Sequence, residues 1–312
     1  MKLCWTLALV LVLFGVLQAS GQGCSDAGFC TMGAMKPDQT FSRKVNFKLR
    51  SIEISYYRGT ASIVSPIIYA VTADINYGLT DKLGFQIKVP FQWVNGNFGE
   101  TQGMSDISFS FTRNLMRTSK LDLNVTLGGK IPTNQSDKTN DSGLVLPMYY
   151  QTSLGSYDII AGISMLTEKW LLAFGYQQAL TANENSFFWG EWVNYPSREY
   201  LFNHDVGIGL KRGIDLMLRV ERNFRFINYS FNVGLLPIYR ITPDQGIILT
   251  RKNGGVVKTT GLALSAIAGF TYHLNTTSSV KFLYGYKITD RPTNPDGLTR
   301  DDVITVAYLL RF

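Results

Sequence analysis

The residues 67–94, IIYAVTADINYGLTDKLGFQIKVPFQWV, contain two stretches (67–77 and 83–94) separated by a turn at 78–82. In both stretches, apolar or aromatic residues occupy every second position, and mostly polar residues lie between them. Because successive side chains of a strand point to opposite faces, each stretch predicts a strand with one apolar face. Strands of soluble domains usually have about 5–6 residues, whereas a strand that crosses a bilayer needs about 9–11. The length therefore favours a transmembrane hairpin.

The same alternation recurs along the chain, and with this hairpin it gives twelve strands. The ten further segments are 43–57, 104–115, 121–131, 157–167, 170–180, 202–211, 214–226, 261–274, 280–289 and 303–312. Single-chain bacterial barrels have an even number of strands. We therefore predict an all-β fold, a transmembrane up-and-down antiparallel β-barrel of about twelve strands. In the first segment the alternation changes phase at Arg50-Ser51, which predicts a bulge.

The connections between these strands also alternate in length. Short turns follow every even strand, at 78–82, 116–120, 168–169, 212–213 and 275–279. Longer loops follow the odd strands, near 58–66, 95–103, 132–156, 181–201, 227–260 and 290–302. Short periplasmic turns and long outer loops are typical of outer-membrane barrels with both termini inside. Fourteen strands are the alternative, because 227–260 includes apolar residues such as Tyr229 and Val233, but its prolines and paired glycines favour a loop.

The first residues predict export. Lys2 precedes an apolar run at 7–17, and the small residues of 19–21 form a signal-peptidase site. Cys24 and Cys30 then remain in an oxidising compartment, where a small disulfide loop is the first interpretation. Lipid modification of Cys24 and a metal or redox pair are the alternatives.

We thus divide the chain into a signal peptide (1–21), an N-terminal segment (22–42) and the barrel (43–312). The middle segment is too irregular for a wall strand, so it forms either a plug in the lumen or a periplasmic tail. Charged residues make up 17% of the chain and the mean hydropathy is +0.02, as expected when apolar outward residues alternate with polar inward ones. The net charge of +7 comes from scattered Lys and Arg residues, which does not favour a nucleic-acid partner.

The final strand carries a second export signal. Alternate apolar residues lead to a terminal aromatic, Phe312, which resembles the signal by which the barrel-assembly machinery recognises its clients. Aromatic residues near the predicted strand ends suit girdles at the two membrane surfaces. These residues are Tyr77, Trp93, Trp170, Tyr272 and Tyr308. The predicted location is the cell outer membrane, with lipid and lipopolysaccharide as surroundings.

Several segments together resemble a family of outer-membrane transporters named for the meta-pathway of phenol degradation. The resemblance rests on Tyr77–Leu83 with Val89-Pro90-Phe91, on Lys130–Thr133 with 154–162, and on 272–312. It covers about two-thirds of the mature chain and implies a barrel fold and a transport role. The segment around Cys24 and Cys30 and the long stretch 227–260 depart from the family pattern.

Enzyme signatures are sparse, and we predict no enzyme activity, cofactor or metal site. The two histidines, His204 and His273, lie at opposite ends of the predicted wall and in no catalytic motif. The charged residues on the inward faces are the candidates for lining the lumen. They are Asp74, Lys88, Asp106, Asp122, Lys130, Asp158, Asp205, Asp215, Arg219, Glu221, Lys281 and Lys287. They either pair and fill a narrow barrel or form a mixed-charge constriction that filters solutes.

The function expected from these features is a channel or transporter for small solutes of unknown identity. One alternative is a non-conducting structural or interaction barrel that works through its outer loops, for example through Trp189, Glu191 and Trp192. The other is a barrel enzyme that acts on lipids, in which His204 faces outward on the strand 202–211.

Overall fold

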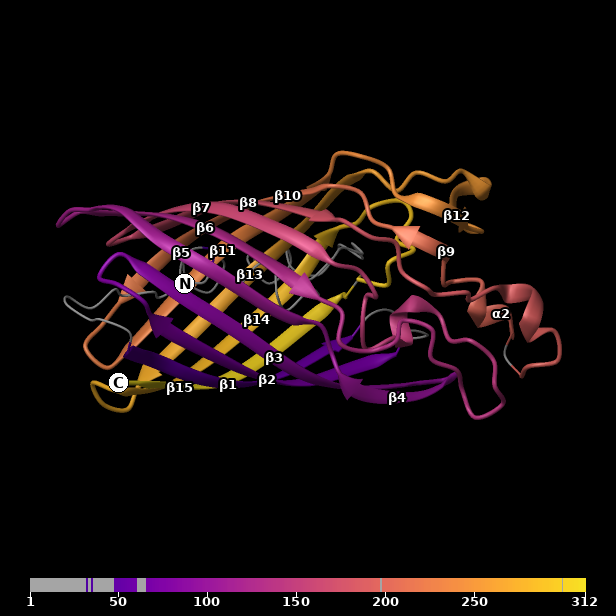
Figure 1. Cartoon of the computed structure of the whole chain (residues 1–312), viewed down its shortest axis with the longest axis horizontal. Coiled ribbons are helices and arrows are strands. Elements are labelled where there is room, and N and C mark those ends of the chain that lie inside the picture. Colours follow the sequence, from indigo (N-terminus) through magenta and orange to yellow (C-terminus); the bar gives the residue numbers. More distant parts are fainter. Residues whose placement is uncertain (1–31, 33–34, 36–47, 61–65, 197, 299) are drawn as a thin grey trace, which may run out of the picture.

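The computed structural model describes residues 32, 35, 48–60, 66–196, 198–298 and 300–312. In this part of the chain twelve antiparallel strands close into a barrel, through the pairings of β1 with β15 and of β2 with β3. The wall strands are β1 (Lys48–Thr60), β2 (Ile67–Gly78), β3 (Leu83–Gly96), β5 (Ile107–Arg117), β6 (Leu121–Ile131), β7 (Asp158–Thr167), β8 (Trp170–Ala179), β10 (Asp215–Arg225), β11 (Tyr229–Arg240), β13 (Gly261–His273), β14 (Ser278–Thr289) and β15 (Asp302–Arg311). Figure 1 shows them as ribbons that are tilted relative to one long axis.

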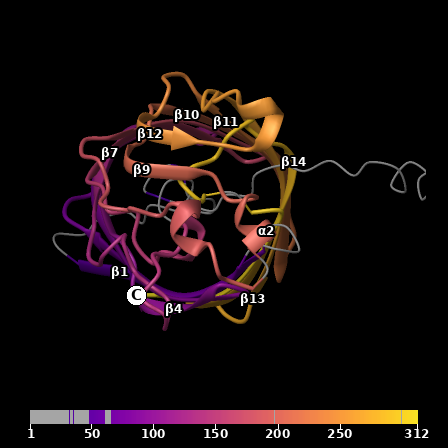
Figure 2. The same ribbon diagram turned by 90° about the vertical axis from the view of Figure 1, so that its right-hand side faces the viewer.

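Shorter elements gather at one end of the barrel (Figures 1 and 2). Strand β4 (Gly99–Met104) folds back and pairs antiparallel with the end of β3. Strand β9 (Val206–Lys211) pairs with β12 (Gln245–Leu249) in a separate two-stranded sheet. The loops also carry η3 (Met148–Tyr150), η4 (Trp189–Trp192), α2 (Arg198–Leu201) and η5 (Lys252–Gly255). Within the described residues, no helix is long and apolar enough to cross a membrane.

The alternation in the first quoted hairpin determines which side chains face inward. Strands β2 and β3 pair in register, so that Asp74 lies opposite Lys88 and both are buried. The intervening apolar residues form the outer face, where they remain accessible. The register between β1 and β2 shifts between Leu49 and Ser51, which confirms the predicted bulge.

The connections confirm that short and long links alternate, but they correct one strand. The short turns are 79–82, 118–120, 168–169, 226–228 and 274–277, and they share one end with the C-terminus. The predicted wall strand 202–211 is wrong: only 206–211 is extended, and it belongs to the small sheet over the long-loop end. Its place in the wall is taken by β11, which lies within the predicted loop 227–260. The predicted turn at 212–213 is therefore wrong as well, and so is the fourteen-strand alternative.

The physical reason lies in strand length and in one proline. Residues 206–211 are too few to span a bilayer and include Gly209 at φ +59°. Residues 229–240 have the required length and alternate, although Pro237 made them resemble a loop. The β10–β11 ladder is interrupted between Met217↔Ile238 and Val220↔Leu235, and Pro237 lies in this gap, whereas on its other side it is paired with Leu264 of β13.

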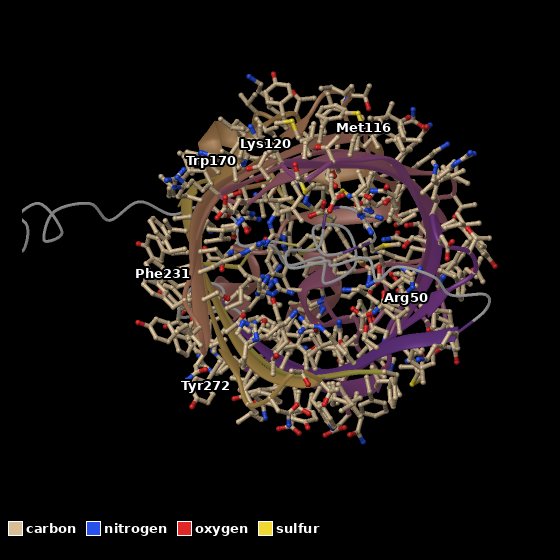
Figure 3. The ribbon with its side chains drawn as sticks, turned by 90° about the vertical axis from the view of Figure 1, so that its left-hand side faces the viewer. Arg50, Met116, Lys120, Trp170, Phe231 and Tyr272 are labelled. Atoms are coloured by element: carbon tan, nitrogen blue, oxygen red, sulfur yellow. The ribbon has the colours of Figure 1, made fainter. Side chains whose placement is uncertain are left out.

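The outer face is an apolar surface of the kind that lipid covers. Large side chains that are at least 36% exposed include Phe111, Leu127, Phe174, Leu218, Leu235 and Phe270. At the short-turn end, aromatic rings stack along β10 and β11, with centroids of Phe224 and Phe231 4.5 Å apart. Viewed from that end, Phe231 and Tyr272 project outside the ribbon, whereas Arg50 lies inside it (Figure 3). This arrangement is typical of a transmembrane barrel with an interfacial girdle.

Candidate functional site

The interior of the barrel is polar and its charges are balanced. Among the described residues, eight buried side chains are basic and eight are acidic. The basic ones are Lys88, Lys130, Arg212, Arg219, Arg240, Lys287, Arg291 and Arg300, and the acidic ones are Asp74, Asp106, Asp158, Asp205, Asp215, Glu221, Asp244 and Asp296. Such charges are stable in an interior only when they are paired or hydrogen-bonded.

Ten of the twelve residues predicted to line the lumen are buried in the structure. They are Asp74, Lys88, Asp106, Lys130, Asp158, Asp205, Asp215, Arg219, Glu221 and Lys287. The other two are more accessible: Asp122 bonds Arg117 at 2.8 Å, and Lys281 lies 3.2 Å from Glu53. Asp106 and Asp205 are buried in loops, whereas the prediction placed both on wall strands.

The inward charges form pairs along neighbouring strands. Asp74 lies 3.6 Å from Lys88 and accepts two hydrogen bonds from Gln86 at 2.9 Å. On β10, Arg219 bonds Glu221 two residues further along the same inner face. These contacts support the interpretation that opposite charges fill part of the lumen.

The densest network lies at the long-loop end, around Arg240 at the end of β11. Its guanidinium bonds Asp215 on β10 at 2.6 Å and Asp244 in the loop 241–260 at 2.9 Å. It also bonds Asp296 in the loop 290–301 at 2.9 Å, and Arg291 lies 3.2 Å from the same carboxylate. One arginine thus ties two outer loops to the wall. The loop residues of this network were missed in the sequence, because nothing in their spacing indicates that the loops fold inward.

The loop 290–301 is packed into the mouth of the barrel. Thr293, Asn294 and Asp296 are almost fully buried, and Asp205 accepts a hydrogen bond from the Asn294 backbone N–H at 2.8 Å. Gly297 adopts φ +66°, and a Cβ there would lie 2.6 Å from the backbone nitrogen of Tyr149. Only glycine fits this close approach between the two loops without strain.

An aromatic cluster covers the same mouth of the barrel. It shows that the predictions for His204 and for the tryptophans Trp189 and Trp192 are wrong. His204 is buried, with its ring centroid 4.9 Å from Tyr149 and 5.7 Å from Phe98, so it does not face outward on a wall strand. Trp189 and Trp192 are also buried, the latter completely, whereas Glu191 is exposed. The two tryptophans therefore hold the loops together and do not present a binding surface.

The second histidine lies at the opposite end. His273 contacts Ser279 across β13 and β14, with 3.1 Å between Nδ1 and Oγ. Neither histidine belongs to a catalytic motif in the sequence. In the structure, His204 and His273 lie at opposite ends of the barrel. In the described part of the chain, no cluster of three or more His, Cys, Asp or Glu side chains is arranged to hold a metal ion.

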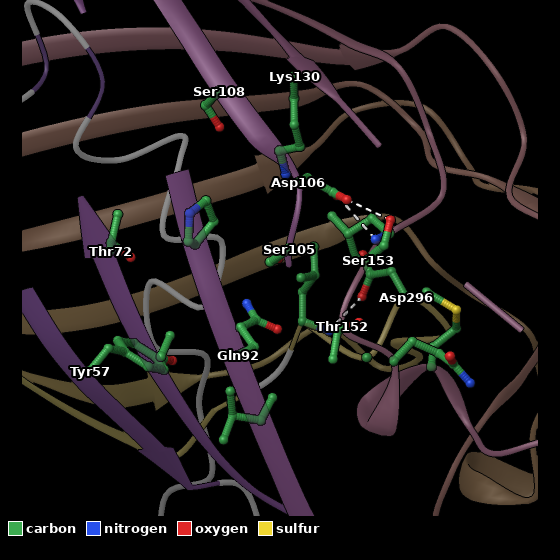
Figure 4. Close-up of a pocket in the computed structure, with 18 of the residues that line it drawn as sticks. Tyr57, Thr72, Gln92, Ser105, Asp106, Ser108, Lys130, Thr152, Ser153 and Asp296 are labelled. Atoms are coloured by element: carbon green, nitrogen blue, oxygen red, sulfur yellow. Dashed lines mark hydrogen bonds between the residues drawn. The ribbon is translucent and has the colours of Figure 1, made fainter. Parts of the chain in front are cut away.

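Between the wall and the inward loops lies a cavity with about 740 Å³ of free space, part of it open to solvent. The wall of this cavity comes from β1, β2, β3, β5 and β6, and its other side from the loops 132–157 and 290–301. Figure 4 shows Lys130 and Gln92 from the wall, and Thr152 and Ser153 from the loop, around the same space.

Two methionines of the N-terminal segment lie inside the barrel. Met32 and Met35 are buried against inward residues of five wall strands, which are Ile160, Ala173, Met217, Leu236 and Ile267. The Arg219 guanidinium also donates to the Met35 carbonyl at 3.5 Å. Cys24, Cys30 and the predicted signal peptide lie outside the described residues.

The closed barrel and its apolar outer face define an outer-membrane β-barrel. Among solved structures, the fold is similar to "the COG4313 outer membrane channel from Pseudomonas putida F1", at a TM-score of 0.61 and 12% identity over 88% of this chain and 99% of that chain. Weaker likenesses are to the NanC porin (TM-score 0.44, 10% identity, 85% and 99% covered) and the CymD monoaromatic hydrocarbon channel (TM-score 0.40, 10% identity, 95% and 99% covered). No family model and no curated relative matches the chain.

Proposed function

We propose that this protein is a passive channel that passes small solutes across the outer membrane. The observation that carries the proposal is the polar, charge-balanced interior, which ends in a lined cavity under the inward-folded loops. A barrel of twelve strands is wider than the eight-stranded barrels that side chains fill, and narrower than open porins. Inward loops then determine the width of the passage, as a constriction does in a selective pore.

The finer assignments are part of the same proposal. The motifs at Tyr77–Leu83 and Lys130–Thr133 support membership of the phenol meta-pathway transporter family. The alternating final strand that ends in Phe312 supports recognition by the barrel-assembly machinery, and the exposed aromatic residues support contact with lipid and lipopolysaccharide. The family name assigns no solute to this chain.

We also propose that residues 22–42 form a plug in the lumen, stiffened by a Cys24–Cys30 disulfide. The burial of Met32 and Met35 against the inner wall supports this proposal. Among the described residues of this segment, Met35 also accepts a hydrogen bond at its carbonyl from Arg219, at 3.5 Å.

Planar-bilayer recording of the refolded chain from residue 22 tests the channel function. We expect unitary current steps that grow with salt concentration. Cation and anion permeabilities should be similar, because buried basic and acidic groups are equal in number. The same recording on a variant that lacks residues 22–42 removes the proposed plug. A folded barrel that is silent in both forms would contradict the channel and support the structural or interaction alternative.

A further inference from the structure

A shallow hollow, open to solvent, lies at the short-turn end of the barrel. It is lined by residues 80–83 at the turn between β2 and β3 and by Arg113 of β5. Strand pairing brings these segments together, because Leu83 and Arg113 are register partners. The turn is held in place by the Thr80 hydroxyl, which accepts from the backbone N–H groups of Lys82 and Leu83 at 3.3 and 3.0 Å. The shape of the hollow is thus fixed by the backbone.

Two exposed cations border this hollow. In the described part of the chain, the side chains of Lys82 and Arg113 make no ion pair and no hydrogen bond. One carboxylate, that of Asp81, also lines the hollow, and its charge interacts with Arg50. The Arg50 guanidinium donates to the Thr80 carbonyl of the same turn at 3.0 Å, which keeps it beside the turn. Three cations and one anion thus surround the hollow, which leaves its potential positive.

The wall next to the hollow is aromatic and faces lipid. Phe85 and Phe111 are register partners on β3 and β5, and their ring centroids lie 5.0 Å apart. Arg113 follows Phe111 by two residues and therefore lies on the same outer face, whereas the alternate residue Thr112 is buried in the interior. Two residues of a strand span about 7 Å, which is close to the thickness of the polar layer on each side of a bilayer. The cations therefore lie at the level of lipid headgroups when the two rings contact acyl chains.

The short-turn end faces the periplasmic leaflet of the membrane. Phospholipids form this leaflet, whereas lipopolysaccharide lies in the opposite leaflet, around the long loops. Exposed basic residues on neighbouring short turns, Lys120 and Lys169, add to the positive charge of this end, and Glu168 is exposed beside them. The anionic group that reaches the hollow from the membrane is therefore a phospholipid phosphate.

We infer that the hollow is a binding site for an anionic phospholipid, whose phosphate Lys82 and Arg113 hold while its acyl chains cover Phe85 and Phe111. A guanidinium donates two parallel hydrogen bonds to a phosphate, and an ammonium adds a point charge. Basic groups beside an apolar transmembrane wall are the usual means by which proteins recognise anionic lipids. The inference depends on the location of the barrel in the outer membrane and not on the proposed channel function.

The test compares phosphatidylglycerol with the zwitterionic phosphatidylethanolamine. Native mass spectrometry of the refolded barrel, with either lipid added to the detergent micelles, measures the affinity for each. One basic residue strengthens binding to an anionic lipid about fivefold, so the parent should bind phosphatidylglycerol at least about tenfold more tightly. Lys82→Gln combined with Arg113→Gln should reduce this preference to about twofold or less. The exchange of Lys82→Arg with Arg113→Lys keeps both charges and should keep the preference.

The matched control is Lys120→Gln combined with Lys169→Gln, which removes the same charge from neighbouring turns that do not line the hollow. It should keep the preference for phosphatidylglycerol. Heat-modifiable migration in SDS gels shows that each variant is folded, as expected for exposed side chains. Equal affinity of the parent for the two lipids overturns the site, and so does an equal loss of preference in the hollow and control variants, since that result means diffuse attraction. The channel recordings are independent of either result.

Discussion

Replacing Arg240 with methionine should release two outer loops from the mouth of the barrel. The side chain is 1% exposed and bonds Asp215, Asp244 and Asp296 at 2.6–2.9 Å, so its loss leaves three carboxylates without their shared cation. Removal of one partner from a buried ion pair costs about 3–5 kcal/mol. At 1.4 kcal/mol per factor of ten, the docked state of the loops loses about two to three and a half powers of ten in population. The wall should persist, because its strands are joined by backbone hydrogen bonds.

Single-channel recording measures this effect as a larger mean conductance and frequent transitions between conductance levels. Proteolysis by trypsin gives an independent reading, since Arg251 in the loop 241–260 should become cleavable. The matched control is Arg222→Met, which removes an arginine of β10 that lies 5.0 Å above the Trp170 ring on the outer face. There we expect a cost of about 1 kcal/mol or less and unchanged current. An Arg240→Met protein with the conductance and trypsin resistance of the parent would refute the claim that this arginine holds the loops.

Three further predictions follow from the interior and the loops. The double variant Met32→Ser and Met35→Ser should raise the open probability about tenfold or more, measured in bilayers, because two buried apolar side chains no longer hold the proposed plug; unchanged gating would contradict it. Burial and the neighbouring Asp296 raise the pKa of Asp244 above its ordinary value of 3.8, so this group favours folding below that value and loses its contribution as pH rises through the higher folded pKa. The parent should therefore gain stability relative to Asp244→Asn as pH falls towards 3.8, which urea unfolding of the micelle-bound barrel measures. A stability difference between the two proteins that does not change with pH would contradict this prediction. Gly297→Ala should destabilise the loop contact by at least about 1 kcal/mol, seen as faster trypsin cleavage of the loops, whereas Gly143→Ala, with open space around its Cβ, tests the positive φ alone.

The strands of this chain could be predicted from the sequence because lipid on one face and a polar interior on the other require apolar and polar residues to alternate along each strand. The burial of Asp74 and Lys88 and the bulge at Arg50 both followed from local alternation. The prediction was wrong where local sequence rules conflict with strand pairing. Pro237 disfavoured a wall strand at 229–240, and alternation favoured one at 202–211. Which of the two enters the wall depends on the neighbouring strands β10 and β13, which only the assembled sheet provides.

By itself, the sequence determined the class of fold, the even strand count and the alternation of turns and loops, because each depends on neighbours within one strand or hairpin. The tertiary structure decided how the loops fold. The three carboxylates around Arg240 come from β10 and from the loops 241–260 and 290–301. The basic residues that line the cavity are Lys88 of β3, Lys130 of β6 and Arg300 of the loop 290–301. These groups lie far apart in the chain and have no shared periodicity. Their contacts form only when the closed wall brings the loops over one mouth, where burial makes each unpaired charge costly and so selects the arrangement that pairs them.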